Sequence, residues 1–86
     1  MSDPQRSVIR QVLGDNAQLS VEVAEVGDDS DLFAIGMSSH ASVNVMVALE
    51  EAFGIMFPDE MLERGVFVSI DAIDAAITQL LAEAAA

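Results

Sequence analysis

The feature that most constrains this chain is a run without proline or glycine, SHASVNVMVALEEAF, at residues 39–53. A turn containing Gly36 and the adjacent serines Ser38 and Ser39 leads into this run, and Gly54 follows it. Apolar residues recur in the run at steps of three or four, which predicts an amphipathic helix over 39–53. Gly54 stands where glycine commonly ends a helix. The spacing predicts a buried face made of Val43, Met46, Leu49 and Phe53.

A helix is also predicted near each end of the chain. Asp3 and Pro4 form a helix-start signal, and apolar residues at helical spacing follow, which predicts a helix over about 4–18. Ser69 stands where it can cap a last helix, and Asp71 falls in the first turn, where the helix dipole favours an acid. The expected buried face of this last helix is Ile70, Ile73, Ile77, Leu80 and Leu81.

The remaining segments are predicted to form connections and one short helix. A short helical turn is expected at 58–62. Residues 19–36 alternate briefly between apolar and acidic, but a lone strand has no partner in so short a chain, so we expect an ordered loop. The sequence therefore predicts an all-α fold, a small four-helix bundle of three principal helices and one short helix, with a long first loop. Residues 1–86 are expected to form a single domain.

Charge excludes several classes of partner. The chain has fifteen Asp and Glu against three Arg and no Lys, a net charge of −12. Nucleic acid and anionic membranes bind basic surfaces, so neither is expected to bind this acidic chain. Proteins with basic surfaces are the expected partners. No apolar run approaches the roughly 20 residues that span a bilayer, and no secretory signal is visible, so we expect a cytoplasmic monomer. Without cysteine, and with His40 as the single histidine, no metal site is expected.

The adjacent serines are the candidate functional residues. As a nucleophile, Ser39 would need a nearby base and an oxyanion hole. His40 follows it directly in sequence, which is a poor position for a Ser–His pair, and the G-x-S-x-G pattern is absent. We therefore expect no enzymatic activity. A second interpretation is that both serines only cap the helix, as serine commonly does.

A third interpretation comes from a pattern that covers about residues 4–82. Its strongest elements are Asp31-Leu32-Phe33, Gly36, Ser39, Val43, Ala48-Leu49-Glu50-Glu51, Phe53 and Phe57-Pro58-Asp59-Glu60. In these positions the chain resembles the acyl carrier proteins, which have an L-G-x-D-S-L turn, a helix ending in A-L-E-E-x-F and an I-P-D-E segment. The ungapped match from Gly36 to Phe53 places the family's modified serine on Ser39. The resemblance implies a 4′-phosphopantetheine arm on Ser39 that holds an acyl or aminoacyl group as a thioester.

The resemblance also implies a surface for partner enzymes. Glu50 and Glu51 match acids that family members present to basic patches, and Val47 matches an apolar position at the centre of that surface. Ser38 and His40 flank the attachment site, where the family usually has Asp and Leu. The implied partners are a phosphopantetheinyl transferase, a ligase that activates the acyl or amino-acid cargo, and a downstream acceptor enzyme.

Departures from the family pattern favour one of its branches. Ala41 and Asn44 stand where fatty-acid carriers often place acids, which argues against docking to the standard fatty-acid enzymes. The S-S-H turn and the M-L-x-R-x-x-F-x-S-I pattern at 61–70 resemble stand-alone bacterial carriers of amino acids, which a synthetase-like ligase loads. The alternatives are a carrier of the fatty-acid or polyketide type, and an acidic helical adaptor without a prosthetic group.

Overall fold

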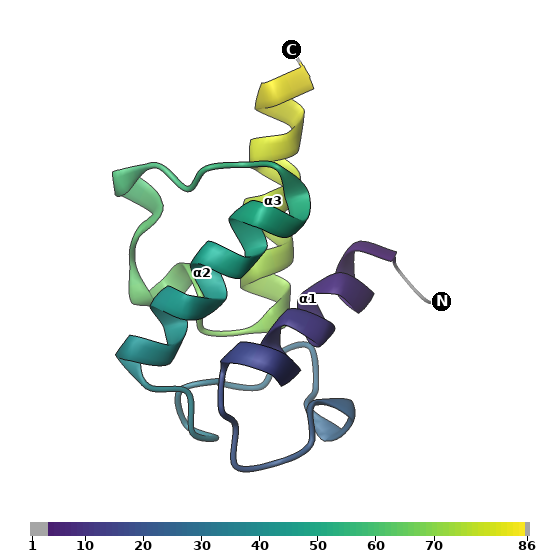
Figure 1. Cartoon of the computed structure of the whole chain (residues 1–86), viewed down its shortest axis with the longest axis vertical. Coiled ribbons are helices and arrows are strands. Elements are labelled where there is room, and N and C mark those ends of the chain that lie inside the picture. The colour runs from purple at the N-terminus through teal and green to yellow at the C-terminus, as the bar shows by residue number, and fades with distance from the viewer. Residues whose placement is uncertain (1–3, 86) are drawn as a thin grey trace.

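The computed structural model describes residues 4–85, which form three α-helices around one apolar core (Figure 1). The helices are α1 (Pro4–Asn16), α2 (Ser39–Phe53) and α3 (Ile70–Ala85). The connections described between them contain single-turn 3-10 helices: η1 (Val23–Glu25), η2 (Asp59–Met61) and η3 (Arg64–Val66). No strand occurs within residues 4–85, so the prediction of an all-α fold is confirmed.

The α-helices begin and end close to the predicted residues. α2 has the predicted bounds, and Gly54 ends it with a left-handed φ of 65°. α1 ends at Asn16, before the predicted residue 18, because Gln18 adopts a φ of 53° that a right-handed helix does not contain. The predicted cap at Asp3 lies outside the described residues. Of the α-helices within 4–85, none is long and apolar enough to cross a membrane.

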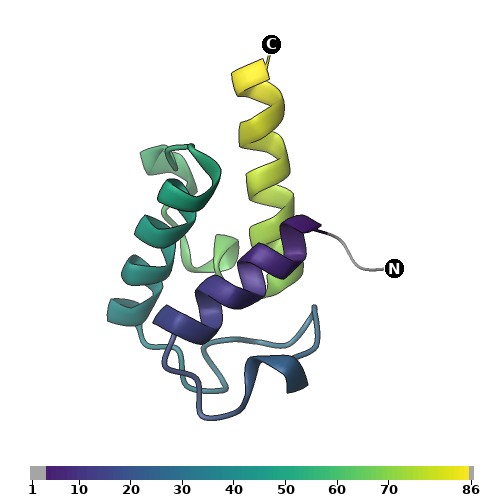
Figure 2. The same cartoon turned by 45° about the vertical axis from the view of Figure 1, so that its right-hand side comes forward.

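The start of α3 is capped as predicted. The N–H of Ala72 donates to Ser69 Oγ at 3.1 Å, and Asp71 lies in the first turn. The short helical turn expected at 58–62 is the single 3-10 turn η2, and a second turn that was not predicted, η3, follows it. Residues 54–69 run back alongside α2 in two views of the molecule (Figure 1 and Figure 2).

The long connection between α1 and α2 is ordered by backbone hydrogen bonds. The N–H of Ser20 donates to the carbonyl of Ile35 at 2.9 Å, which closes the connection on itself. The N–H of Leu32 donates to the carbonyl of Val68 at 2.7 Å, which joins it to the segment before α3. The brief alternation in its sequence forms no strand and contains the turn η1.

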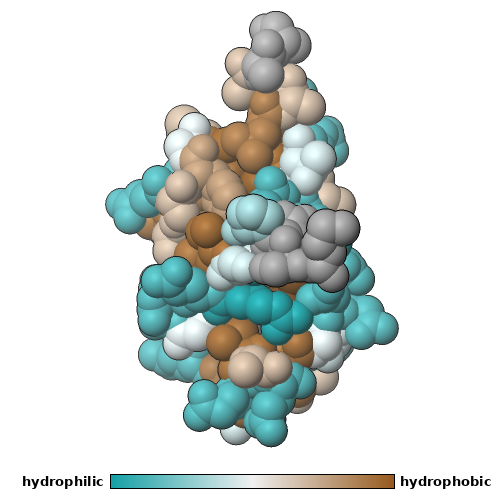
Figure 3. Space-filling model, turned by 90° about the vertical axis from the view of Figure 1, so that its right-hand side faces the viewer, coloured by the Kyte–Doolittle hydropathy of each residue, from teal (hydrophilic) through white to brown (hydrophobic). Residues whose placement is uncertain are grey.

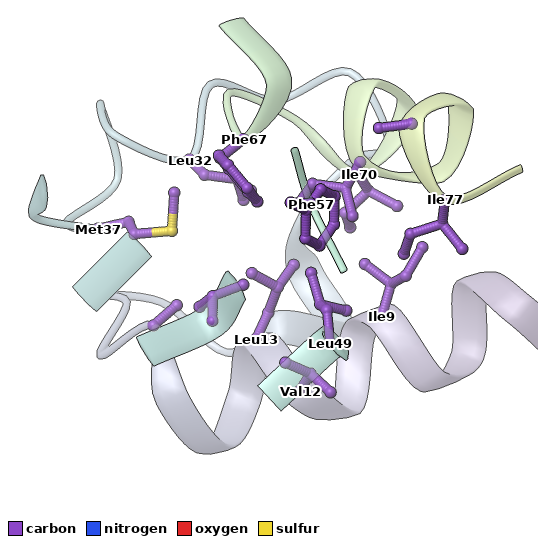
Figure 4. Packing of buried hydrophobic residues seen from close by; sticks show 14 of the residues in the cluster. Ile9, Val12, Leu13, Leu32, Met37, Leu49, Phe57, Phe67, Ile70 and Ile77 are labelled. Atoms are coloured by element: carbon purple, nitrogen blue, oxygen red, sulfur yellow. The ribbon is translucent and has the colours of Figure 1, made fainter. Parts of the chain in front are cut away.

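The core draws side chains from all three α-helices and from the connections (Figure 4). The largest side chains that are fully buried are Ile9, Leu13, Leu32, Met37, Val45, Leu49, Ile70, Ile73 and Ile77. Phe57 and Phe67 pack edge to face, with ring centroids 5.3 Å apart. The predicted face of α3 is confirmed, since its isoleucines and Leu80 are buried and Leu81 is half-buried.

The buried face of α2 was predicted correctly at Leu49 and wrongly at Val43. Its buried residues are Ala41, Val45 and Leu49, whereas Val43 is 52% exposed. The other two predicted residues of the face are half-buried. Both candidate faces pass through Leu49, and valine stands at both 43 and 45, so spacing alone does not choose between them. Packing of α2 against α1 selects the face that contains Val45.

Arginines of α1 join that helix to the long connection and to α3. Arg6 forms ion pairs with Asp28 at 3.0 Å and Asp74 at 3.1 Å, and it also pairs with Asp71. The hydrogen bond from Arg6 to Asp71 raises the pKa of Arg6 above its ordinary value. Arg10 pairs with Asp28 as well.

On the face shown in Figure 3, hydrophilic side chains form a band across the middle of the molecule, between apolar areas.

Candidate functional site

The two serines at the start of α2 differ in their hydrogen bonds. Ser38 is the N-cap, with an extended backbone, and its Oγ accepts the N–H of Ala41 at 3.0 Å. Ser39 is the first helical residue and is exposed. Among residues 4–85, nothing hydrogen-bonds the hydroxyl of Ser39. Ser38 alone is therefore the cap, and Ser39 keeps an open hydroxyl.

The electrostatics of this helix start suit an anionic group. The first N–H groups of an α-helix lack acceptors within the helix, and the helix dipole gives them partial positive charge. No acid lies in the first turn of α2 to neutralise that charge. The hydroxyl of Ser42 donates to the carbonyl of Ser39 at 2.6 Å, so it is directed at the backbone and away from Ser39 Oγ. The residues present therefore fit a phosphate-linked group on Ser39.

A groove of about 270 Å³ lies beside Ser39. Its lining comes from α2, from the connection before it and from the segment that returns alongside it: Phe33, Ser39, Ser42, Val43, Met46, Leu62, Glu63, Arg64 and Phe67. Most of these side chains are apolar, and Val43 and Leu62 are exposed. Sequence reasoning missed the groove because Val43 was assigned to the core and because its walls are distant in sequence.

Arg64 is the one basic residue in this lining. Its guanidinium carbon lies 4.0 Å from the centroid of the Phe33 ring, which is a cation–π contact. Within the part of the chain that the structure describes, no carboxylate lies at ion-pair distance from Arg64. The only signal in the sequence was its place in the M-L-x-R pattern, which assigns it no role.

The other predicted site residues fall into two groups. His40 is exposed beside Ser39, and Val47 and Glu51 are exposed further along α2. Glu50 is half-buried, and its carboxylate accepts the N–H of Phe57 at 2.9 Å. Glu50 therefore holds the chain that leaves α2, whereas the neighbouring Glu51 is directed to solvent.

The arrangement offers a hydroxyl for modification. No hydrogen bond joins Ser39 to His40, so the contact that activates a serine nucleophile is missing from this geometry. Residues 4–85 contain no group of three or more His, Asp or Glu side chains that could hold a metal ion. An exposed serine at a helix start, beside an apolar groove, matches an attachment point for a covalent group.

Comparisons with known proteins bear on this site. The sequence model of a family described as "Phosphopantetheine attachment site" matches residues 7–66. An aminoacyl carrier protein of Agrobacterium fabrum (strain C58) is 44% identical over 75 residues, which cover 87% of this chain and 90% of that protein.

Solved structures of similar proteins share the fold. One is a carrier protein from Agrobacterium tumefaciens, crystallised with an engineered glycine:[carrier protein] ligase of Bradyrhizobium japonicum and ATP. It is 43% identical, with a TM-score of 0.85, over 87% of this chain and 97% of that chain. A solution structure of a protein from Agrobacterium tumefaciens is also 43% identical, with a TM-score of 0.74, over 94% of this chain and 99% of that chain.

Proposed function

The chain belongs to the family of proteins with a phosphopantetheine attachment site, and from this premise we propose that Ser39 bears the 4′-phosphopantetheine arm. The observation that supports Ser39 is the division between the two serines. The hydroxyl of Ser38 is engaged by Ala41, whereas that of Ser39 is open. A phosphate on Ser39 Oγ would lie at the positive end of α2.

Proteins of this family carry a group and do not transform it, so the chain is a carrier and not an enzyme. When bound, the phosphopantetheine arm supplies the thiol on which the thioester forms. The residues of the chain position the arm and present a surface to partners. Serine suits the attachment because its oxygen forms a stable phosphodiester.

The cargo we propose is an aminoacyl group, loaded by an amino acid:carrier protein ligase. Support comes from the relative that is an aminoacyl carrier protein, and from the similar carrier that was crystallised with a glycine:[carrier protein] ligase. A phosphopantetheinyl transferase would install the arm, and a downstream acceptor enzyme would take the aminoacyl group.

The proposed partner surface follows α2 from its first turn to its last. It consists of Ser38, His40, Val47, Glu50 and Glu51. Val47 and Glu51 are exposed there, which leaves an apolar contact and an acid accessible to a partner. One oxygen of Glu50 accepts a backbone hydrogen bond, so only the other is open to a basic partner.

The same proposal includes the domain organisation, a short fourth helix and the cellular location. Residues 1–86 form one monomeric domain, supported by the single core that the three α-helices share. Residues 58–66, with their two 3-10 turns, are the counterpart of a short fourth helix. The protein acts in the cytoplasm, in keeping with the ATP bound in the ligase complex of the similar carrier.

Intact mass after co-expression with a broad-specificity phosphopantetheinyl transferase tests the attachment site. Wild type and Ser38→Ala should gain one phosphopantetheinyl group, and Ser39→Ala none. Ser38→Ala should be less stable by about 1 kcal/mol because the N–H of Ala41 loses its cap. Ser39→Ala should unfold close to the wild-type temperature, since its hydroxyl makes no bond. A mass gain that survives Ser39→Ala would contradict the assignment.

The cargo needs a separate test on the modified protein. Incubation with glycine, ATP and a glycine:[carrier protein] ligase should add one glycyl group, which hydroxylamine should remove because a thioester holds it. Modification by a long-chain acyl ligase, with none by the amino-acid ligase, would favour a fatty-acid carrier instead.

A further inference from the structure

The three arginines of this acidic chain have different surroundings. Arg6 and Arg10 of α1 are paired with the carboxylates of Asp28, Asp71 and Asp74. Arg64 has no such partner within residues 4–85, although the chain carries fifteen acids. A guanidinium binds anionic oxygens strongly and in a fixed plane, so an unpaired one in an acidic protein is available to an anion from elsewhere.

Arg64 is exposed, and its guanidinium rests on the ring of Phe33. The guanidinium lies 4.0 Å from the ring centroid, and Phe33 is half-buried against the core. The turn that contains Phe33 is itself held, because the side chain of Asp31 accepts the N–H groups of Phe33 and Ala34 at 3.0 and 3.2 Å. Arg64 therefore stacks on an ordered platform in the groove that Ser39 also lines.

The charged and apolar residues of the groove suit the successive groups of the phosphopantetheine arm. A group on Ser39 Oγ starts inside the lining, and attachment gives it a high effective concentration there. Its phosphodiester is anionic, which suits the guanidinium of Arg64. The geminal methyl groups that follow the phosphate are apolar, which suits Val43, Met46 and Leu62. Glu63 is the only other ionisable side chain in the lining.

We propose that Arg64, stacked on Phe33, is a positioning residue that binds the arm's phosphodiester and directs the arm into the groove. The inference rests on the proposed attachment at Ser39. It gives the arm a resting place in the groove beside α2, whose lining does not include Val47 or Glu51, so these two residues stay uncovered for a partner enzyme.

NMR on the modified protein tests this placement without any turnover. Wild type should show nuclear Overhauser contacts from the arm's geminal methyls to the methyls of Val43 and Leu62. Arg64→Gln should lose these contacts and shift the phosphorus resonance of the phosphodiester. Arg64→Lys, which keeps the charge but cannot stack in the same plane, should retain only part of the effect. Added salt should shift the phosphorus resonance of wild type and leave that of Arg64→Gln nearly unchanged.

Two further variants serve as controls. Glu63→Gln removes one charge of the opposite sign from the same lining, so it changes the net charge by +1 where Arg64→Gln changes it by −1, and it should keep the contacts. Phe33→Leu removes the platform and should weaken them, with circular dichroism confirming that the helices remain. Identical contacts and phosphorus resonances in wild type and Arg64→Gln would overturn the inference, as would their absence in wild type. Intact mass separates this from a failure at Ser39, because every sample is first shown to carry the arm.

Discussion

At the scale of single residues, neighbours of the same type have different surroundings. Glu50 and Glu51 are adjacent acids near the end of α2 and were given the same role from the sequence. In the structure Glu50 accepts the N–H of the buried Phe57, whereas Glu51 is exposed. Glu50 therefore stabilises the fold through one carboxylate oxygen and keeps only the other for a partner, whereas the carboxylate of Glu51 is free of any such bond within residues 4–85.

This difference predicts unequal effects of the same substitution. Glu50→Ala should lower the free energy of unfolding by about 1 kcal/mol relative to Glu51→Ala, because it leaves a buried N–H without its acceptor. The two variants are matched in charge change and in helix propensity, so urea denaturation compares them directly. Glu50→Gln, which keeps an acceptor oxygen, should recover most of the loss. Equal stabilities of the two alanine variants would show that the bond to Phe57 contributes nothing.

The sequence can favour one residue over its neighbour where a motif distinguishes the two positions, but not where packing between helices decides. The ungapped spacing from Gly36 to Phe53 selects Ser39 over Ser38, and the cap at Ser38 is an independent reason for the same choice. Val43 was misplaced because two faces of α2 are both apolar. The choice between them is made by α1, which no local pattern encodes.

At the scale of elements, the long connection from 17 to 38 depends on α1 for part of its order. Arg10 donates to the carbonyls of Val23 and Val26 at 3.0 and 2.8 Å, and it pairs with Asp28. One side chain thus serves as the hydrogen-bond partner of a stretch that has little regular structure of its own. Arg6, which also pairs with Asp28, has a higher pKa in the folded protein than in the unfolded chain. Its protonated form therefore stabilises the fold at every pH below the ordinary arginine pKa, and this stabilisation is lost only as the pH rises through the raised pKa.

Removing this partner should loosen the connection before the helices. We expect Arg10→Ala to lower the free energy of unfolding by about 2 kcal/mol, since two carbonyls and a carboxylate lose a charged donor. Hydrogen exchange should accelerate most at residues 22–28. Arg64→Ala, outside this network, should leave the exchange of that stretch unchanged. Wild-type protection of residues 22–28 in Arg10→Ala would contradict the assigned role.

The three α-helices were predictable because each has a periodic apolar face and a clear start or stop. The groove and the arginine network were not, since both join segments that are distant in the chain. Arg6 and Asp74, for example, come together only when α1 and α3 pack. The sequence also indicated the short turn at 58–62, where the structure has η2, but it did not indicate the second turn, η3.

At the scale of the whole molecule, a net charge of −12 on a body with a radius of gyration of 11.9 Å produces strong self-repulsion. That net charge already includes the three arginines, and two of them are committed to ion pairs within the fold. The same charge makes the protein attractive to a basic enzyme surface.

Salt should therefore stabilise the protein. The screening length is about 10 Å at 0.1 M salt, close to the radius of gyration of 11.9 Å, so most of the rise in melting temperature should occur below about 0.1 M. Sodium and potassium chloride should act alike at equal ionic strength, because screening requires no specific cation. A melting temperature that falls with salt would mean that the arginine ion pairs outweigh the repulsion among the acids.

The adjacent serines differ only after α2 has formed. In an unfolded chain they are two equivalent hydroxyls one position apart, and nothing in their own chemistry separates them. Folding commits the hydroxyl of Ser38 to Ala41 and leaves that of Ser39 open. If the arm is installed on the folded protein, its attachment is a chemical record that a molecule had folded. A brief exposure to transferase would then mark the native fraction of a mixture, and mass spectrometry could count it.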